Sequence, residues 1–280
     1  MSSFVAYGKM IKVSHTIFSM PFALAALLLA GRDHPVSVFQ VFCIVMAVLT
    51  ARSAAMGFNR IVDRDIDAAN PRTANREIPS GALTLRSAWL WTIGSALAFV
   101  LFAAFLGPLT LALSPVALCI VLGYSLTKRF TALCHLVLGA ALAIAPLAVW
   151  IAITGGVAWP AVLLSLAVGT WVAGFDMIYA CQDAAFDLET GLRSVPSVLG
   201  VKAALILSVI LHIVTITALA CVPLCIELGP AYWVGLALIG GVLVWEHSIV
   251  TPTDLTRINK AFFDLNGYIS LVFLTCVWFA

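Results

Sequence analysis

Long apolar segments separated by short polar ones dominate the chain. No Asp, Glu, Lys or Arg occurs in residues 87–127 or in residues 130–175. Turn-forming residues interrupt each stretch near its middle, Gly107-Pro108 in the first and Thr154-Gly155-Gly156 in the second. A helix needs about 20 residues to cross the hydrocarbon of a bilayer, so each stretch predicts two membrane helices joined by a tight turn.

The same pattern along the whole chain predicts an all-α membrane bundle of nine transmembrane helices. Strand-like alternation of period two is missing, and backbone groups in lipid must bond within their own segment, which favours helices. The predicted spans are 15–31, 36–57, 86–106, 108–126, 133–153, 159–180, 202–222, 230–249 and 262–280. We expect a single domain over residues 1–280, made of two related halves of about 1–130 and 131–280.

Composition and charge agree with a protein surrounded by the lipid bilayer. Of the 280 residues 62% are hydrophobic and 10% are charged, against roughly 25% charged in soluble domains. The net charge of +2 does not indicate a nucleic-acid partner, because the basic residues alternate with carboxylates. Every Lys and Arg except Arg32 lies at one set of alternate span ends, which predicts a multi-pass inner-membrane protein with a cytoplasmic N-terminus.

Two polar segments at predicted cytoplasmic helix ends carry the candidate chemistry. In the first, Asn59, Asp63 and Asp67 recur every four residues, so a helix would place them on one face with rungs roughly 6 Å apart. In the second, Asp183 and Asp187 have the same spacing. Further members of this segment are Asp176, two turns before Asp183, and Tyr179. We expect Arg60, Arg64 and Asp65 to be solvated charges at the helix end.

Carboxylates at membrane depth need a compensating charge, because each costs ~2.5–3.5 kcal/mol on insertion scales. Ligands made of oxygen alone favour Mg²⁺, and the lack of Cys and His among these positions argues against zinc. The same interval of 120 residues separates Asp63 from Asp183 and Asp67 from Asp187. This repeat predicts two half-bundles that present acidic helix ends to one cytosol-facing cavity, where two Mg²⁺ ions would bind a diphosphate.

Basic residues close to both segments are candidates for stabilising a leaving pyrophosphate. They are Arg72, Arg76, Lys128, Arg129 and Arg193. The histidines are expected to be interior or interfacial residues, with Glu246-His247 as a candidate for an acceptor pocket.

At these motifs the sequence resembles the UbiA superfamily of intramembrane aromatic prenyltransferases. The first signature of that family, N-x-x-x-D-x-x-x-D, is matched by Asn59, Asp63 and Asp67, followed by Arg72 and Arg76. The second signature, D-x-x-Y-A-x-x-D-x-x-x-D, is matched from Asp176 to Asp187 and includes Tyr179, Ala180 and Asp183. A third feature, Y-x-x-x-K, is matched by Tyr124 and Lys128. The resemblance extends over the whole chain and includes the nine-helix count.

The resemblance implies an enzyme that transfers alkyl groups other than methyl. A polyprenyl diphosphate would bind through two Mg²⁺ held by Asn59, Asp63, Asp67, Asp183 and Asp187, with Arg72, Arg76, Tyr124, Lys128, Asp176 and Tyr179 contacting the diphosphate. Its ionisation gives an allyl cation that an electron-rich aromatic ring attacks ortho to a hydroxyl. The H-T-x-F-x-x-P-F pattern from His15 to Phe22 departs from the R-x-D-K-P-x-G of 4-hydroxybenzoate enzymes. The acceptor therefore stays open between 4-hydroxybenzoate and a dihydroxynaphthoate, in ubiquinone or menaquinone biosynthesis.

Two other classes of membrane protein also use acidic residues within a helical bundle. An ion-coupled transporter is the main alternative, but it predicts carboxylates near mid-membrane in broken helices rather than at cytoplasmic helix ends. A CDP-alcohol phosphotransferase requires a D-G-x-x-A-R motif, and no Asp of this chain is followed by Gly. The prenyl chain length and the oligomeric state do not follow from the sequence.

Overall fold

The computed structural model describes residues 3–11 and 19–280 of the chain, and within them it is almost wholly helical. The β pairing recorded there is an isolated bridge between Thr251 and Asp254. Eight helical segments of this described part are long and apolar enough to cross a membrane. A shorter apolar helix, α2 (Met20–Ala30), occupies the described part of the first predicted span, whose residues 15–18 lie outside the description. The prediction of an all-α bundle with nine apolar helices is confirmed.

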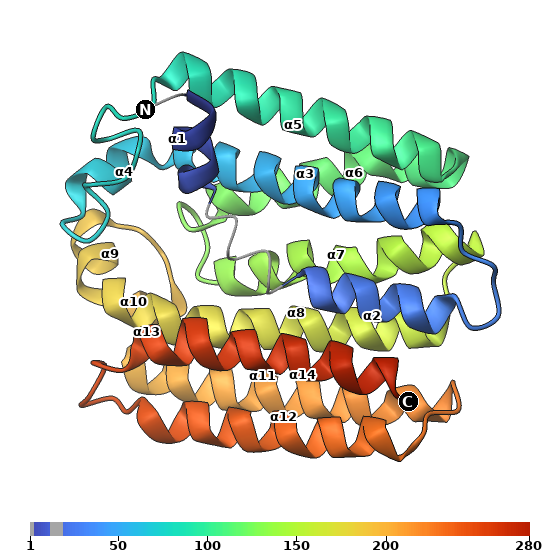
Figure 1. Ribbon diagram of the computed structural model, residues 1–280. Coiled ribbons are helices and arrows are strands. Elements are labelled where there is room, and N and C mark those ends of the chain that lie inside the picture. Colours follow the sequence, from blue (N-terminus) through green and yellow to red (C-terminus); the bar gives the residue numbers. More distant parts are fainter. Residues whose placement is uncertain (1–2, 12–18) are drawn as a thin grey trace. The chain divides into compact units, whose positions relative to one another are not determined.

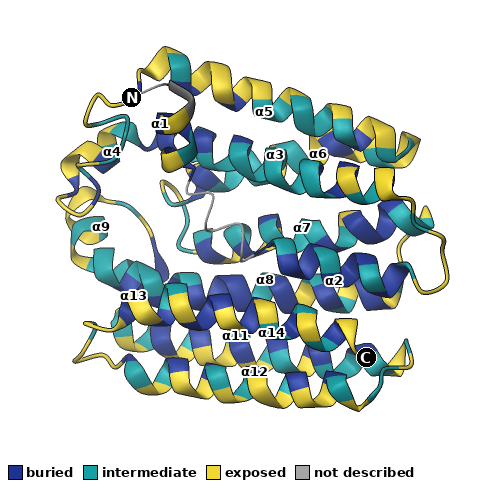
Figure 2. Cartoon of the chain, in the orientation of Figure 1, coloured by how far each residue is buried: buried dark blue, intermediate teal, exposed yellow. Residues whose placement is uncertain are grey.

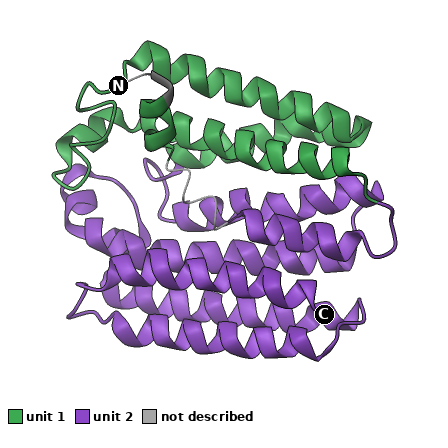
Figure 3. Cartoon of the chain, in the orientation of Figure 1, with its two compact units in different colours: residues 1–16, 36–126 green, residues 17–35, 127–280 purple. Residues whose placement is uncertain are grey.

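The helices group into two compact units (Figure 3). Unit 1 contains residues 1–16 and 36–126, and unit 2 contains residues 17–35 and 127–280. The boundary at residue 126 lies near the expected division between the two halves, but residues 17–35 belong to the second unit. That the halves are related copies stays a prediction.

Unit 1 is built around a long antiparallel pair of helices, α3 and α5, which run side by side (Figure 1). Its elements are α1 (Ser3–Met10), α3 (Val38–Val62), α4 (Arg64–Ala69), α5 (Leu85–Leu106) and most of α6 (Pro108–Thr127). Close packing depends on Gly57 of α3, because a Cβ there would overlap the side chain of Thr92 on α5. The Tyr7 hydroxyl of α1 donates to the Ser53 carbonyl of α3 over 2.9 Å, which fastens the first helix to the pair.

Unit 2 is a larger bundle of long helices with short irregular segments between them. Its elements are α2, α7 (Cys134–Thr154), α8 (Trp159–Ala180), a 3₁₀ turn (Cys181–Asp183), α9 (Ala184–Thr190), α10 (Val195–Leu199), α11 (Val201–Cys221), a second 3₁₀ turn (Val222–Leu224), α12 (Pro230–Ile249), α13 (Ile258–Lys260), a π-helical segment (Ala261–Leu265) and α14 (Asn266–Trp278).

Helix α8 lies at the centre of unit 2, with α7 and α11 packed against it. Figure 2 shows it buried along most of its length. Trp171 of α8 is fully buried, and its indole N–H donates to Asn266 Oδ1 of α14 over 2.6 Å. The Phe22 ring of α2 contacts the same indole at a centroid distance of 5.0 Å. The apolar surroundings of α8 thus come from helices distant in sequence.

Large apolar side chains remain exposed on several long helices, as in Figure 2, where α5 and α12 carry many exposed residues. Examples are Leu90, Leu97 and Leu101 on α5, Ile213 on α11 and Val234 on α12. Extensive exposed apolar surface on long helices is typical of contact with lipid rather than with water.

The predicted turns form where the glycines are. Helix α5 ends before Gly107, which has a φ of 135°, and α6 begins at Pro108. Helix α7 ends at Thr154, followed by Gly155 in the left-handed conformation with a φ of 76°. A side chain with a Cβ is strained at either position, so the glycines allow the reversals. Three boundaries differ from prediction, because α3 extends to Val62 rather than ending at residue 57, helical structure continues beyond Ala180 to Thr190, and the last span begins at Ile258.

Gly139 permits the close approach of α7 and α8, and it generates the first prediction. A Cβ at Gly139 would overlap the backbone carbonyl of Gly169, which cannot move without displacing α8. We expect Gly139→Ala to destabilise the protein by about 1–3 kcal/mol through overpacking. Thermal denaturation in detergent, followed by circular dichroism, would measure the loss as a lower midpoint.

Gly240→Ala is the matched control, since a Cβ at that helical position of α12 meets no atom of the described structure within 4 Å. Alanine is the better helix former, so this variant should keep or slightly raise the midpoint. Equal midpoints for the two variants would contradict the packing argument.

Candidate active site

The first acidic motif crosses a break between two helices of unit 1. Asn59 lies on α3, Asp63 follows the last residue of α3, and Asp67 lies on α4. The Asp63 amide donates to the Asn59 carbonyl over 3.0 Å, and the Asp67 amide donates to the Asp63 carbonyl over 2.7 Å. These bonds keep the helical spacing across the break. The helix is therefore interrupted at Asp63, although the four-residue register is preserved and the side chains of Asn59 and Asp63 remain in contact.

Asp67 is the most constrained carboxylate of this motif. It is buried, and Arg76 Nη1 donates to its Oδ1 over 2.6 Å. The Thr73 hydroxyl donates to its main-chain carbonyl over 3.0 Å, which holds the following loop against α4. Its second oxygen, Oδ2, is buried without a hydrogen-bond partner in the described part of the chain. One oxygen of Asp67 is thus neutralised by arginine and the other is left for a further ligand.

Asp63 and Arg60 are both buried beside Asn59. The Asn59 amide Nδ2 donates to Asp63 Oδ2 over 3.1 Å, and Arg60 Nη1 donates to Asn59 Oδ1 over 3.2 Å. The expectation that Arg60 is a solvated helix-end charge is wrong, because its side chain turns inward and orients the asparagine. For Arg64 and Asp65 the expectation holds, since they form an exposed pair at 3.4 Å.

The second acidic motif crosses a similar break in unit 2. Asp176 lies on α8, Asp183 ends the 3₁₀ turn after it, and Asp187 lies on α9. Asp183 has backbone angles of φ −102° and ψ 4°, and Asp63 has φ −93° and ψ 4°. Both residues occupy the sparsely populated bridge region of backbone conformation, in which many active-site residues lie. The two motifs thus share a local conformation as well as a spacing.

Asp176 forms a buried contact that the sequence did not predict. His135 Nδ1 of α7 lies 2.7 Å from Asp176 Oδ2. The Val195 amide donates to His135 Nε2 over 3.3 Å, so Nδ1 is the nitrogen that carries a proton toward the carboxylate. His135 thereby connects α7, α8 and the start of α10. The residues next to His135 in the sequence are mostly apolar, and they do not indicate that it contacts Asp176.

Asp187 is held by the loop that follows its helix. The Ser194 hydroxyl donates to Asp187 Oδ2 over 2.8 Å, and Ser194 also caps the N-terminus of α10. The Arg193 amide donates to the Lys128 carbonyl over 2.7 Å, while Arg193 Nη1 donates to Phe130 O over 3.1 Å. These bonds join the loop at 191–194 to the segment at 128–130.

The remaining candidates lie on the same ends of their units' helices. Tyr179 of α8 is partly buried, and its ring contacts Phe262 at a centroid distance of 4.1 Å. Tyr124 of α6 is partly buried. Arg72 is exposed in the loop after α4, where its amide donates to Asn70 Oδ1 over 2.9 Å. Each predicted residue thus lies on a motif helix, on a loop next to one, or at the end of α6, and their ligands stay predictions.

The residues of both motifs fit a hard divalent cation. Their side chains offer carboxylate and amide oxygens without sulfur or imidazole among the motif positions, which is the ligand type that Mg²⁺ prefers. The buried Oδ2 of Asp67 also needs an electropositive partner. An unpaired carboxylate oxygen removed from water is costly, so a cation at this position would offset the cost.

Comparison with known proteins identifies the family. The UbiA prenyltransferase family model matches residues 19–272. This chain belongs to the UbiA prenyltransferase family. A relative from Sodalis glossinidius, 4-hydroxybenzoate octaprenyltransferase, is 32% identical over 255 residues, which cover 90% of this chain and 86% of the relative.

Solved structures of UbiA homologues have the same fold. An apo structure from Aeropyrum pernix K1 is 33% identical with a TM-score of 0.87, and it covers 95% of this chain and 98% of its own. A homologue from Archaeoglobus fulgidus bound to GPP and Mg²⁺ is 20% identical, with a TM-score of 0.78 and 98% coverage of both chains. The protein is accordingly a multi-pass membrane prenyltransferase, and both the family resemblance and the enzyme class predicted from the motifs are confirmed.

The ion pair between Arg76 and Asp67 gives a prediction about the UbiA fold of this chain. Arg76→Gln leaves the buried Asp67 carboxylate without its cation, which should destabilise the protein by about 1–3 kcal/mol. Adding Asp67→Asn removes the stranded charge, so the double variant should recover part of the loss. Thermal midpoints of both single variants and the double variant, measured without divalent cations, give the coupling. If the midpoint change of the double variant equals the sum of the two single changes, Arg76 and Asp67 are not coupled and the prediction is wrong.

Proposed function

We propose that the protein transfers a polyprenyl group from a polyprenyl diphosphate to an aromatic hydroxy acid, with Mg²⁺ as its cofactor. The observation that carries this proposal is the buried, incompletely paired Asp67 in a motif whose backbone break at Asp63 recurs at Asp183. Two carboxylate motifs of one conformation suit a substrate that carries two phosphate groups, because each phosphate needs compensating positive charge.

The proposed Mg²⁺ ligands are the amide and carboxylate side chains of Asn59, Asp63, Asp67, Asp183 and Asp187. When bound, Mg²⁺ would neutralise diphosphate charge and make pyrophosphate a better leaving group. Arg76 and Asn59 orient two of the carboxylates through the bonds of 2.6 and 3.1 Å described above. Ser194 does the same for Asp187. Preorganised ligands of this kind do not need to rearrange when the substrate binds.

The polar groups nearby suit the diphosphate itself. We propose that Arg72, Lys128 and Tyr124 contact its oxygens, with Asp176 and Tyr179 completing the site. The Arg193 amide anchors the main chain of Lys128, which fixes the point from which its side chain extends. Cleavage of the allylic C–O bond releases pyrophosphate and leaves an allyl cation. The aromatic ring then forms the new C–C bond, and loss of the ring proton restores aromaticity.

Aromatic rings near Tyr179 would protect such a cation from water. The Phe262 ring lies tilted against Tyr179 at a centroid distance of 4.1 Å, and Phe175 contacts Phe262 edge to face at 5.3 Å. Aromatic faces attract positive charge, and an apolar wall excludes the water that would quench it. The name of the Sodalis relative supports 4-hydroxybenzoate as acceptor, and a dihydroxynaphthoate is the alternative. We further propose that the site faces the cytoplasm of an inner-membrane protein, since the basic residues concentrate at the motif ends of the helices.

Carboxylate removal tests the proposal directly. Asp63→Ala or Asp183→Ala should lower turnover at least about a hundredfold, as expected when a preorganised electrostatic group is lost. Purified protein given Mg²⁺, a polyprenyl diphosphate and either 4-hydroxybenzoate or 1,4-dihydroxy-6-naphthoate would be assayed by mass spectrometry of the prenylated product. The product mass also decides between the two acceptors.

Asp65→Ala and Glu189→Ala are matched controls, because each removes an exposed carboxylate from the same segments. Both should retain near-normal turnover. Full activity in Asp63→Ala or Asp183→Ala, with Mg²⁺ present, would contradict the proposed mechanism.

Lys128 provides a separate test of diphosphate binding. Lys128→Ala removes one charged donor, so KM for the polyprenyl diphosphate should rise roughly tenfold to a hundredfold. KM for the aromatic acceptor should change little. Lys202→Ala, which removes an exposed cation from the same unit, is the control for general loss of charge. Unchanged kinetics in Lys128→Ala would exclude this residue from the site.

A further inference from the structure

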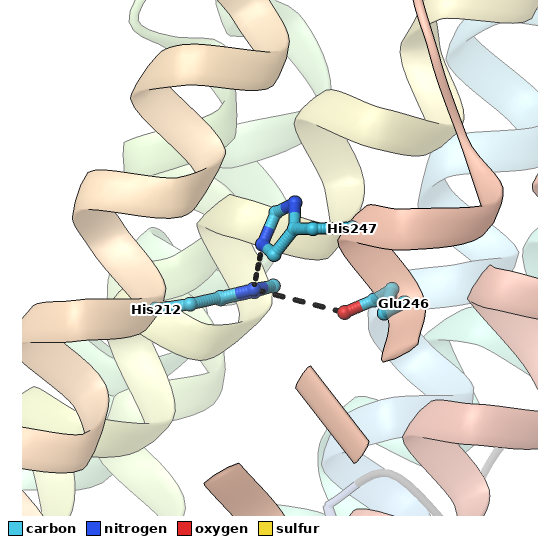
Figure 4. A group of neighbouring side chains, drawn as sticks. All are labelled: His212, Glu246 and His247. Carbon is cyan, nitrogen blue, oxygen red and sulfur yellow. Dashed lines mark hydrogen bonds and ion pairs between the residues drawn. The ribbon is translucent and has the colours of Figure 1, made fainter. Parts of the chain in front are cut away.

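A second cluster of potential metal ligands lies in unit 2, apart from the acidic motifs in sequence. It contains His212 of α11 together with Glu246 and His247 of α12 (Figure 4). The three side chains point toward one another, and one ligand atom from each lies within 4.8 Å of the others. His212 Nδ1 is 2.9 Å from His247 Nε2 and 3.6 Å from Glu246 Oε2.

The hydrogen bonds around His212 determine which of its nitrogens carries a lone pair. His212 Nε2 lies 3.2 Å from the Trp171 carbonyl, which can only accept, so Nε2 is the protonated nitrogen. In neutral His212 the lone pair is then on Nδ1 and faces the other two side chains. A Cβ on Gly174 would overlap this imidazole, so the glycine lets the ring lie against α8.

Glu246 places a carboxylate oxygen, a hydrogen-bond acceptor, next to His212 Nδ1. The residue is completely buried, and Asn266 Nδ2 donates to its Oε1 over 2.7 Å. Its Oε2, the oxygen nearer His212, is buried without a hydrogen-bond partner in the described structure. A proton on His247 Nε2 would satisfy His212 but leave Oε2 unpaired, at a cost of about 1–3 kcal/mol. A cation among the three atoms satisfies all of them.

We propose that His212, Glu246 and His247 bind a divalent transition-metal ion of the Zn²⁺ type. With zinc bonds of about 2.0–2.1 Å, two ligand atoms at a tetrahedral angle lie roughly 3.3 Å apart. The observed separations of 2.9 and 3.6 Å lie on either side of this value. Two imidazoles and one carboxylate suit zinc and disfavour Mg²⁺, which binds oxygen ligands.

Neighbouring residues form hydrogen bonds that orient two of the proposed metal ligands. The Trp171 carbonyl fixes the tautomer of His212, and Asn266 orients Glu246. Asn266 Oδ1 in turn accepts from the Trp171 indole over 2.6 Å. Such partners hold metal ligands in place. The ion would join α11 to α12, while Asn266 and Trp171 extend the connection to α14 and α8, so the site stabilises the bundle of unit 2.

Binding of Co²⁺, a spectroscopic substitute for Zn²⁺, tests the proposal. Chelator-treated protein in detergent would be titrated with Co²⁺ in excess Mg²⁺, so that oxygen-only sites stay filled. We expect one Co²⁺ per chain with the visible absorption of tetrahedral coordination, without a thiolate charge-transfer band and displaced by Zn²⁺. The metal should also raise the thermal midpoint.

Variants assign the absorption to the cluster. His212→Gln and Glu246→Gln should weaken Co²⁺ binding by more than the roughly 10–100-fold typical of changes outside the ligand set. His34→Gln, which alters an exposed histidine, should bind normally, as should Asp63→Ala and Asp183→Ala. His247→Cys keeps a ligand, so it should retain the metal and gain a thiolate charge-transfer band. This gain decides the question even if His212→Gln fails to fold.

Three results would overturn the metal site: no tetrahedral Co²⁺ spectrum in the wild type, competition by Mg²⁺ at equal concentration, or an unchanged spectrum in His247→Cys. Any of these would mean that the cluster shares protons rather than a metal. Because the readout is Co²⁺ absorption, a failure of prenyl transfer alone leaves this conclusion intact, and the two proposals fail separately.

Discussion

The structure depends on compensating negative charge inside an apolar helical bundle. A carboxylate within a membrane protein is stable only where donors or cations replace the water it loses. Five acids in the described residues have such a partner within their own unit. The pairs are Asp63 with Asn59, Asp67 with Arg76, Asp176 with His135, Asp187 with Ser194 and Glu246 with Asn266. These contacts hold the acidic side chains in fixed orientations, which a site for a charged ligand requires.

Compensation is incomplete at two places, and these differ in ligand chemistry. Asp67 Oδ2 lies in a motif that offers only oxygen ligands, whereas Glu246 Oε2 faces two imidazoles. Oxygen ligands favour Mg²⁺ and imidazoles favour zinc-like ions, so the chain can keep the two kinds of cation apart by ligand type. A cation at the acidic motifs would act on a diphosphate, while one at His212 would join helices. The two sites could thus select different cations even though Asp67 and Glu246 are both buried.

Much of the fold follows from sequence, whereas the contacts within the site do not. The spans from 86 to 180 agree closely with the helices, because Gly107 and Gly155 end their helices in conformations that disfavour other residues. The spacing of Asp63 and Asp67 was predictable from helical periodicity, but the break at Asp63 was not, since residues 58–70 contain neither Gly nor Pro to mark it. His135 meets Asp176 across 41 positions of sequence. Such a contact depends on how α7 packs against α8, which the sequence near either residue does not predict. Arg60 was misjudged for the same reason.

The shared break at Asp63 and Asp183 makes the two motifs alike in backbone, yet Asp67 and Asp187 accept from different donors. Asp67 is bound directly by the guanidinium of Arg76, so one of its oxygens is already neutralised. Asp187, in the equivalent position, accepts from the neutral hydroxyl of Ser194. A hydroxyl orients a carboxylate without cancelling its charge. The first motif therefore joins its carboxylate to a resident guanidinium, whereas the second uses a hydroxyl. A repeated backbone conformation thus holds its two equivalent carboxylates with donors of unequal charge.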